Sequence, residues 1–315
     1  MKHKIEYLKL KSISNDQRFN LNSTFGFKIL KDSIVSIGII YPLLAWKNQG
    51  FIILIDGFKR LEIAKSIGIT ELPFILMSGN LGFEEIIKIR YYNIKQEDAE
   101  LNAHQKLSIL MMLKEADQAD QIIKNWQKIL NLFNPEKYLN ILNWPKIALD
   151  YIYNYNVSIK QLQYIISQSS EVITEIFLLA TSLSIRIVEL STIVEILSEI
   201  ALNEKVSIIS ILNREQIHSL MENRDLNRNQ KILKLKKILN EWRYPTIIKY
   251  QKQLDDQLKK LSFNENTQIL YDKTFEKSNI ILSVRLRNSE DLDNFVNLIT
   301  DKSNKLTLKA ILSSL

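Results

Sequence analysis

The chain has 315 residues, 46% of them apolar, and its 42 basic and 35 acidic side chains give a net charge of +7. This length and apolar content are enough for two or three domains with separate cores. The sequence contains no cysteine, which excludes disulfides, thiolate metal sites and cysteine nucleophiles. It shows no export signal and no long apolar run, so we expect a cytoplasmic protein with no membrane partner.

The first third of the chain alternates between helix and strand patterns. Apolar residues between Ile29 and Ile37 recur at helical spacing and stop at Gly38, which predicts a short helix closed by glycine. A strand with Pro42 near its start follows, and the turn Asn48-Gln49-Gly50 predicts a hairpin with the apolar run 51–56.

That run ends at Asp56-Gly57 and opens directly into a helical pattern. Gly57 allows a sharp turn, and Lys59 and Arg60 would lie in the first helical turn, where free N–H groups favour an anion. The helix dipole disfavours cations at this end, so the two basic residues predict a bound phosphate. The alternative is a solvated first turn. For Asp56 we expect a helix N-cap in preference to a functional carboxylate.

Residues 83–215 are helical in pattern almost throughout, with breaks at Asn134-Pro135 and Asn143-Trp144-Pro145. We expect an all-helical middle domain in which the tyrosines of DYIYNYN (150–156) serve packing more than base stacking. The three histidines, His3, His104 and His218, lack metal-ligand spacing, and we interpret them as incidental.

Most of the excess positive charge lies in residues 216–260, with 11 basic and 5 acidic side chains. An apolar stripe marks one face of the predicted helix, and lysines lie mostly elsewhere. One interpretation is a packed helix with a solvated lysine face; the other is contact with nucleic-acid phosphates. The stripe is Ile232, Leu235, Leu239 and Trp242, and the lysines are Lys231, Lys234, Lys236 and Lys237.

In the last segment the hydrophobic pattern changes from helical spacing to the alternation typical of strands. TQILYDKTF and NIILSVRLR alternate like strands around an EKS turn, and SEDLDNFVNLITDK predicts a helix capped by Ser289. We expect a β-hairpin plus helix, either as a monomeric cap or with an exposed edge that pairs two chains into a homodimer.

Several of these motifs occur in a familiar order. SIVSIGIIYPLLAW, FIILIDGFKRLEIAKSIG and ELPFIL together resemble the N-terminal domain of ParB-type partition proteins, which shares a fold with sulfiredoxins. The resemblance covers about residues 5–110. It implies that Gly57, Lys59 and Arg60 hold the phosphates of a nucleotide, CTP with Mg²⁺, assisted by Asn93.

The chain departs from the family pattern at several positions. Phe58 replaces an acidic residue in the turn, and near Asn93 the acidic and basic positions hold Tyr92 and Gln96. Because Mg²⁺ in phosphate sites usually needs a carboxylate, we expect hydrolysis to be weakened or absent. Sulfiredoxin chemistry is excluded, since it requires a cysteine.

The resemblance extends in weaker form to the rest of the chain. WPKIALDYIYNYNVSIKQLQYIISQS is similar to the segment that follows the DNA-reading helix-turn-helix of ParB-type proteins. Residues 103–215 carry a net charge of −2, so we expect mostly non-specific backbone contact with DNA through the lysines after residue 230. Trp242 to Pro245 and Phe275-Glu276 resemble the family's C-terminal module.

The sequence therefore predicts a mostly helical α+β protein with four parts. They are a ParB/sulfiredoxin-like nucleotide-binding domain (1–100), a helical domain (101–215), a basic connecting helix (216–245) and a small α+β domain (246–315). The expected function is that of a DNA-associated, partition-type regulatory protein, with no predicted catalytic residue or metal ligand. The resemblance implies that a nucleotide switches it. The alternative is an enzyme of the same fold, a nucleoside triphosphatase or small-molecule kinase, with Asp56 or Glu62 as acid or base.

Overall fold

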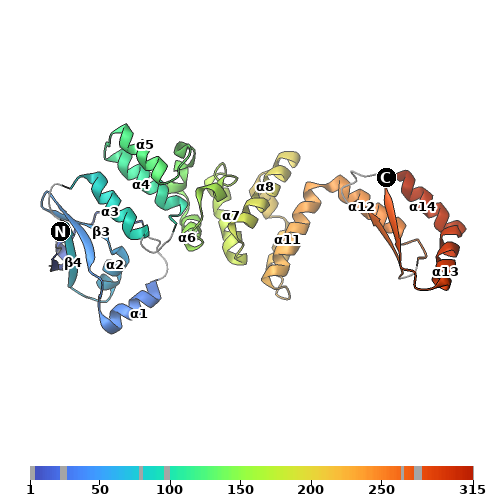
Figure 1. Cartoon of the computed structure of the whole chain (residues 1–315), viewed down its shortest axis with the longest axis horizontal. Coiled ribbons are helices and arrows are strands. Elements are labelled where there is room, and N and C mark those ends of the chain that lie inside the picture. Colours follow the sequence, from blue (N-terminus) through green and yellow to red (C-terminus); the bar gives the residue numbers. More distant parts are fainter. Residues whose placement is uncertain are drawn as a thin grey trace.

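The computed structural model describes residues 4–21, 27–77, 81–95, 100–263, 266–272 and 279–314. The described chain forms an elongated row, with a sheet-containing unit at one end, helices in the middle and a small hairpin-containing unit at the other end (Figure 1). The predicted class, mixed α+β and mostly helical, is confirmed.

The N-terminal unit is built on a four-stranded sheet in the order β1-β4-β2-β3. Strands β2 and β4 run parallel, and the other two pairs are antiparallel. The sheet and its neighbours comprise β1 (Ile5–Lys9), the 3₁₀ turn η1 (Leu10–Ser12), α1 (Phe27–Ile37), β2 (Leu43–Asn48), β3 (Phe51–Asp56), α2 (Phe58–Ser66) and β4 (Glu71–Met77).

The predicted local signals of this unit are confirmed. Gly38 closes α1 with φ +74° and donates its N–H to the carbonyl of Ile34 at 3.0 Å. The β2–β3 hairpin turns at Gln49 and Gly50. Both residues have positive φ, which lets a two-residue turn match the right-handed twist of the strands beside it.

The middle of the chain is helical, and both predicted breaks are present. Asn134 has φ +46° and Trp144 is extended, and the segment between them forms a 3₁₀ helix instead of an α-helix. The elements are α3 (Phe83–Lys95), α4 (Ala103–Glu115), α5 (Asp120–Ile129), η2 (Pro135–Asn143), α6 (Lys146–Asn154), η3 (Ile159–Leu162), α7 (Ser170–Leu183), α8 (Ile187–Glu204), α9 (Ile208–Leu212), α10 (Glu215–Glu222) and α11 (Arg228–Arg243).

Three hydrophobic clusters stabilise the chain. The first joins the sheet to α3, α4 and α5 around Phe74 and Trp126, and the second runs from α4 to α11 around Phe177. Helix α4 contributes to both, with Leu110 in the first and Leu107 in the second. This sharing couples the sheet unit to the helices; the division of the chain at residues 100, 215 and 245 stays a prediction.

The predicted apolar stripe of α11 is confirmed. Ile232, Leu235 and Leu239 are buried, and the helix packs against α8 and α7. At its end, Arg243 forms a two-point ion pair with Glu199 on α8. The helix is therefore part of the helical core and is not a free connector.

The C-terminal unit contains α12 (Pro245–Leu258), β5 (Thr267–Tyr271), β6 (Ile280–Val284), α13 (Ser289–Thr300) and α14 (Lys302–Ser314). Strands β5 and β6 pair antiparallel as predicted, but β6 ends at Val284 and not at Arg287, and the expected EKS turn lies outside the described residues. The cap of α13 is Asn288 and not Ser289. The sequence pattern missed α14, whose residue Ile311 packs on Leu254 and Leu261 in the third cluster. Phe275 and Glu276 lie outside the described residues.

Among the described residues, no helix is both long and apolar enough to cross a lipid bilayer.

The start of α4 offers a test of this architecture. Asn102 is buried and forms a reciprocal capping box with Gln105, whose amide also donates to the Leu21 carbonyl at 3.0 Å. Asn102→Ala should lower the free energy of unfolding by about 2 kcal/mol, the upper range for a cap, because the freed groups are buried. Asn227 makes the same box at the exposed start of α11, and Asn227→Ala should cost only about 0.5–1 kcal/mol. Equal losses in urea unfolding would contradict the role given to burial.

Candidate functional site

Gly57 makes the turn between β3 and α2 by itself. Its φ is +96°, a conformation that side chains disfavour. A Cβ built on Gly57 would lie 2.8 Å from Cγ of the fully buried Leu43 and 3.2 Å from Nη2 of Arg60. Both the backbone conformation and the space therefore require glycine, as the sequence predicted for this position.

Arg60 holds the preceding segment against this turn. Its Nη1 donates to the carbonyls of Tyr41 at 2.5 Å and Pro42 at 3.0 Å, and Nη2 donates to Oδ2 of Asp56 at 3.2 Å. Because a guanidinium has five N–H groups, these contacts use three of them. Arg60 is therefore a structural clamp on the segment that leads into β2, with its remaining donors at the rim of the turn.

Arg90 of α3 is the functional residue that the sequence analysis missed. Its side chain is 3% exposed, and it donates from Nη1 to Oδ1 of Asp56 at 2.6 Å and from Nε to the Phe19 carbonyl at 3.1 Å. Burial lowers the pKa of Arg90, and the Asp56 carboxylate acts against that shift.

A signal for Arg90 was present in the sequence. On α3, Arg90 falls on the same buried face as Ile86 and Ile87. A basic residue on an apolar face needs a buried acceptor.

Asp56 is not the helix cap that we expected. The N-cap of α2 is Gly57, and no side chain caps the helix. The two oxygens of Asp56 instead accept from Arg60 and Arg90. The reason is geometric, since the left-handed turn at Gly57 leaves the carboxylate facing α3. Asp56 thus supplies a counter-charge for Arg60 within the protein, and cations in this first turn do not by themselves require a bound anion.

The other predicted residues lie on α2 and α3. Lys59 is half-buried, and burial lowers the pKa of its ammonium group. Phe58 is 3% exposed and packs in the first hydrophobic cluster. Asn93 is half-buried and follows Arg90 by three residues on α3, which places the two on neighbouring positions of the helix. The turn and α3 therefore meet at Asp56.

Two neighbours of Asn93 were singled out in the sequence. Tyr92 is 62% exposed, and Gln96 lies outside the described residues. Across the described ranges, no group of three or more His, Asp or Glu side chains has a metal-binding arrangement.

His104, which the sequence analysis interpreted as incidental, makes side-chain contacts within the helical part of the chain. Its Nδ1 lies 2.9 Å from the Tyr153 hydroxyl and 3.3 Å from Oγ of Ser108, and burial lowers its pKa. Burial also raises the pKa of Tyr153, which is close enough to Arg90 to sense its charge. Both contacts of His104 use one ring nitrogen. The arrangement is therefore not a catalytic triad, in which the two ring nitrogens link a nucleophile to an orienting group. It joins α4 to α6.

The four lysines of α11 differ in their surroundings. Lys231 donates to the Met221 carbonyl at 2.5 Å, and Lys236 forms an ion pair with Glu189. Lys234 and Lys237 are exposed on the side away from the apolar stripe, and the ammonium of Lys237 is 4.0 Å from Glu241, at the limit of an ion pair. Only two of the four therefore face outward.

Comparison with known proteins gives structural neighbours only. No protein-family model matches the chain, and no curated protein matches it. One neighbour is the C-terminally truncated chromosome-partitioning protein ParB from Caulobacter crescentus complexed with CTP-γ-S, at 16% identity and TM-score 0.26, covering 55% of this chain and 98% of its own.

The same ParB complexed to the centromeric parS site shows 15% identity and TM-score 0.30, covering 60% of this chain and 98% of its own. A Pnob8-like ParB-N domain shows 16% identity and TM-score 0.33, covering 73% of this chain and 98% of its own. Similarity at this level establishes neither family membership nor function.

The turn itself can be tested with a pair of glycines. Gly57→Ala should lower the free energy of unfolding by about 2–3 kcal/mol, because it adds a contact with Leu43 to the strain of positive φ. Gly50, at φ +83° in the hairpin, has no heavy atom within 4 Å of an added Cβ. Gly50→Ala should therefore cost only about 1 kcal/mol. Similar losses for the two variants in urea unfolding would contradict the crowding at Gly57.

Proposed function

We propose that this chain is a DNA-associated regulatory protein of the partition type whose N-terminal unit binds a nucleoside triphosphate. The observation that supports a polyphosphate site most directly is the pair Arg60 and Arg90 on one carboxylate beside the first turn of α2. Lys59 adds a third basic side chain, in the first turn of α2. The sequence resemblance to ParB-type proteins makes CTP with Mg²⁺ the first nucleotide to test.

In this proposal the conformation of the turn would change little when phosphate binds. The backbone N–H groups of the first turn of α2, the Lys59 ammonium and the uncommitted N–H groups of Arg60 would be the donors. Asn93 would add an amide from α3. Arg90 would act as a positioning residue, since its hydrogen bonds hold Asp56 and the Phe19 carbonyl.

Lys59 gives the cleanest test, because Arg60 also supports the fold. A ligand at about 100 times its Kd stabilises a protein by roughly 2.7 kcal/mol, which raises the melting temperature. Lys59→Ala should weaken CTP binding about tenfold and remove roughly half of that stabilisation. Thermal unfolding with and without CTP and Mg²⁺ measures the loss of stabilisation and, from it, the loss of affinity.

The matched control is Lys31→Ala, which removes an exposed lysine from α1. It should leave the CTP-dependent shift unchanged. An undiminished shift in Lys59→Ala, or an equal loss in both variants, would reject the assignment of the phosphate site.

DNA contact is proposed for the lysines of α11. Lys234 and Lys237 would make the main contacts, because both are exposed, and Lys231 and Lys236 would add less, because each already has a protein acceptor. Such contact is electrostatic and independent of base sequence. The partner is therefore duplex DNA bound mostly through its backbone.

Salt dependence tests this contact. Each phosphate contact contributes about 0.9 to the slope of log K against log salt, so Lys234→Gln with Lys237→Gln should reduce that slope by about 2. Lys231→Gln with Lys236→Gln, at the same charge, should reduce it by less. The measurement is fluorescence anisotropy of a duplex oligonucleotide across a salt series. Equal slopes in the wild type and both double variants would contradict the proposal.

We also propose that the C-terminal unit pairs two copies of the chain. Leu270 and Ile281 face each other across the hairpin and are 53% and 58% exposed. Residues 261–315 carry seven basic and seven acidic side chains, so two copies would not repel each other. An exposed apolar hairpin of this kind is a common self-association surface.

Leu270→Glu should convert a dimer to a monomer in sedimentation velocity, because it would bury a carboxylate in the interface. Leu233→Glu places the same change on an exposed leucine of α11 and should leave the dimer intact. A wild-type protein that is monomeric at micromolar concentration would contradict this pairing.

The geometry favours binding over catalysis. As a general base, Asp56 would have to accept a proton, yet both of its oxygens already accept hydrogen bonds from arginines. Glu62, the other candidate, is exposed on α2. An assay of phosphate release with several nucleotides, compared between wild type and Asp56→Asn, distinguishes the enzyme from the binding protein.

A further inference from the structure

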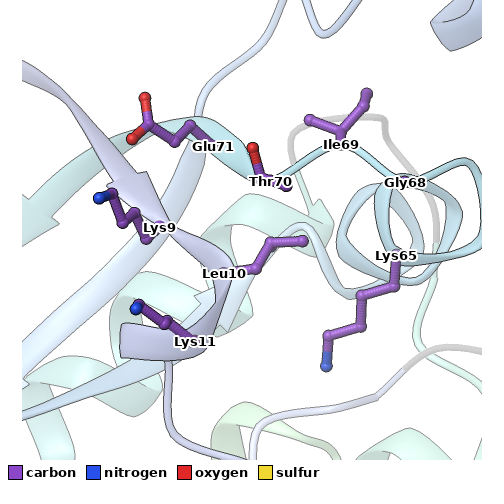
Figure 2. Close-up of a pocket in the computed structure, with 8 residues that line it drawn as sticks. All are labelled: Lys9, Leu10, Lys11, Lys65, Gly68, Ile69, Thr70 and Glu71. Atoms are coloured by element: carbon purple, nitrogen blue, oxygen red, sulfur yellow. The ribbon is translucent and has the colours of Figure 1, made fainter.

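A pocket of about 550 Å³ lies at the C-terminal end of α2, the opposite end from Gly57. It is formed where the end of β1 and η1 approach the last turn of α2 and the loop into β4 (Figure 2). The N–H of Leu10 donates to the Thr70 carbonyl at 2.9 Å, which fixes the two segments together. The lining residues are Lys9, Leu10, Lys11, Lys65, Gly68, Ile69, Thr70 and Glu71.

The pocket has an excess of positive charge. Three lysines and one glutamate line it, and Glu71 is the cross-strand neighbour of Lys9. In the part of the chain that the structure describes, none of the three ammonium groups has a carboxylate within 4.0 Å.

Cations lie on two sides of an apolar surface. Figure 2 shows Lys9 and Lys11 on one side of Leu10 and Lys65 on the other, with Ile69 beside Gly68. Leu10 and Ile69 are only half-buried, so the pocket exposes apolar surface next to these charges. This combination suits an amphiphilic anion, and the volume falls in the usual range for small-molecule sites.

Local structure explains only part of this arrangement. Lys65 suits the negative end of the helix dipole, and Gly68, at φ +78°, belongs to the helix C-terminus. Neither the helix dipole nor the glycine at the helix end accounts for Lys9 and Lys11, which come from another part of the chain. A helix C-terminus repels anions, so a ligand here must be held by the three lysines together.

We propose that this pocket binds a small phosphate monoester that carries an apolar or aromatic group. The phosphate would lie among the ammonium groups of Lys11, Lys65 and Lys9, and the apolar group would cover Leu10 and Ile69. Lysines act as point charges for phosphate, so binding should weaken as salt rises. This site is separate from the nucleotide site proposed at Gly57 and does not depend on it.

The test uses phenyl phosphate as probe, in the full chain carrying Lys59→Ala so that the proposed nucleotide site contributes little. Calorimetric titration should show tighter binding of phenyl phosphate than of inorganic phosphate or benzyl alcohol. Lys11→Gln with Lys65→Gln should weaken it about tenfold. Lys28→Gln with Lys47→Gln removes the same charge from exposed positions of α1 and β2 and should leave the affinity unchanged.

Three results would overturn the proposal. In the first, phenyl phosphate binds no more tightly than inorganic phosphate. In the second, the two double variants lose the same amount of affinity for phenyl phosphate. In the third, the site depends on the lysines but binds only duplex DNA. The last result would make the pocket part of a nucleic-acid surface. Because Lys11→Gln with Lys65→Gln should keep the CTP-dependent melting shift in a chain with native Lys59, failure here and failure of the nucleotide site are distinguishable.

Discussion

The N-terminal unit depends on the carboxylate of Asp56. Through Arg60 it fixes the segment that leads into β2, and through Arg90 it fixes α3 and the carbonyl of Phe19. A guanidinium as buried as Arg90 is stable only with an anion beside it, so the carboxylate and the two arginines form one unit. Four segments that are distant in sequence meet at this point.

The same unit sets the properties of the candidate site. Asp56 neutralises part of the positive charge at the start of α2, so a ligand there meets a prearranged and still electropositive turn. Helix α4 packs into both large cores, and the contact between His104 and Tyr153 lies close enough to Arg90 for the tyrosine to sense its charge. The turn is therefore connected to the helical part of the chain through packing and through charge.

The sequence was informative where the signal was local. Gly38, the hairpin turn at Gln49-Gly50 and the sharp turn at Gly57 each need a positive φ that glycine and a few other residues tolerate, and all were predicted. The stripe of α11 follows from helical periodicity, which also needs no knowledge of the fold. Asp56 was misinterpreted because its role depends on the segment that lies opposite it, which is α3. The cap of α13 was misplaced by one residue, at Ser289 in place of Asn288.

By itself the sequence determined the class of the fold, the order of most elements and the position of the basic helix, because hydrophobic period, glycine position and charge are properties of short segments. Only the tertiary structure decided that Asp56 binds two arginines, that Lys231 and Lys236 already have protein acceptors, and that Lys9 and Lys11 share a pocket with Lys65. Each of these contacts joins residues from different elements. Apart from the i,i+4 pair of Asp56 and Arg60, such pairings are set by how the elements pack and cannot be deduced from spacing along the chain.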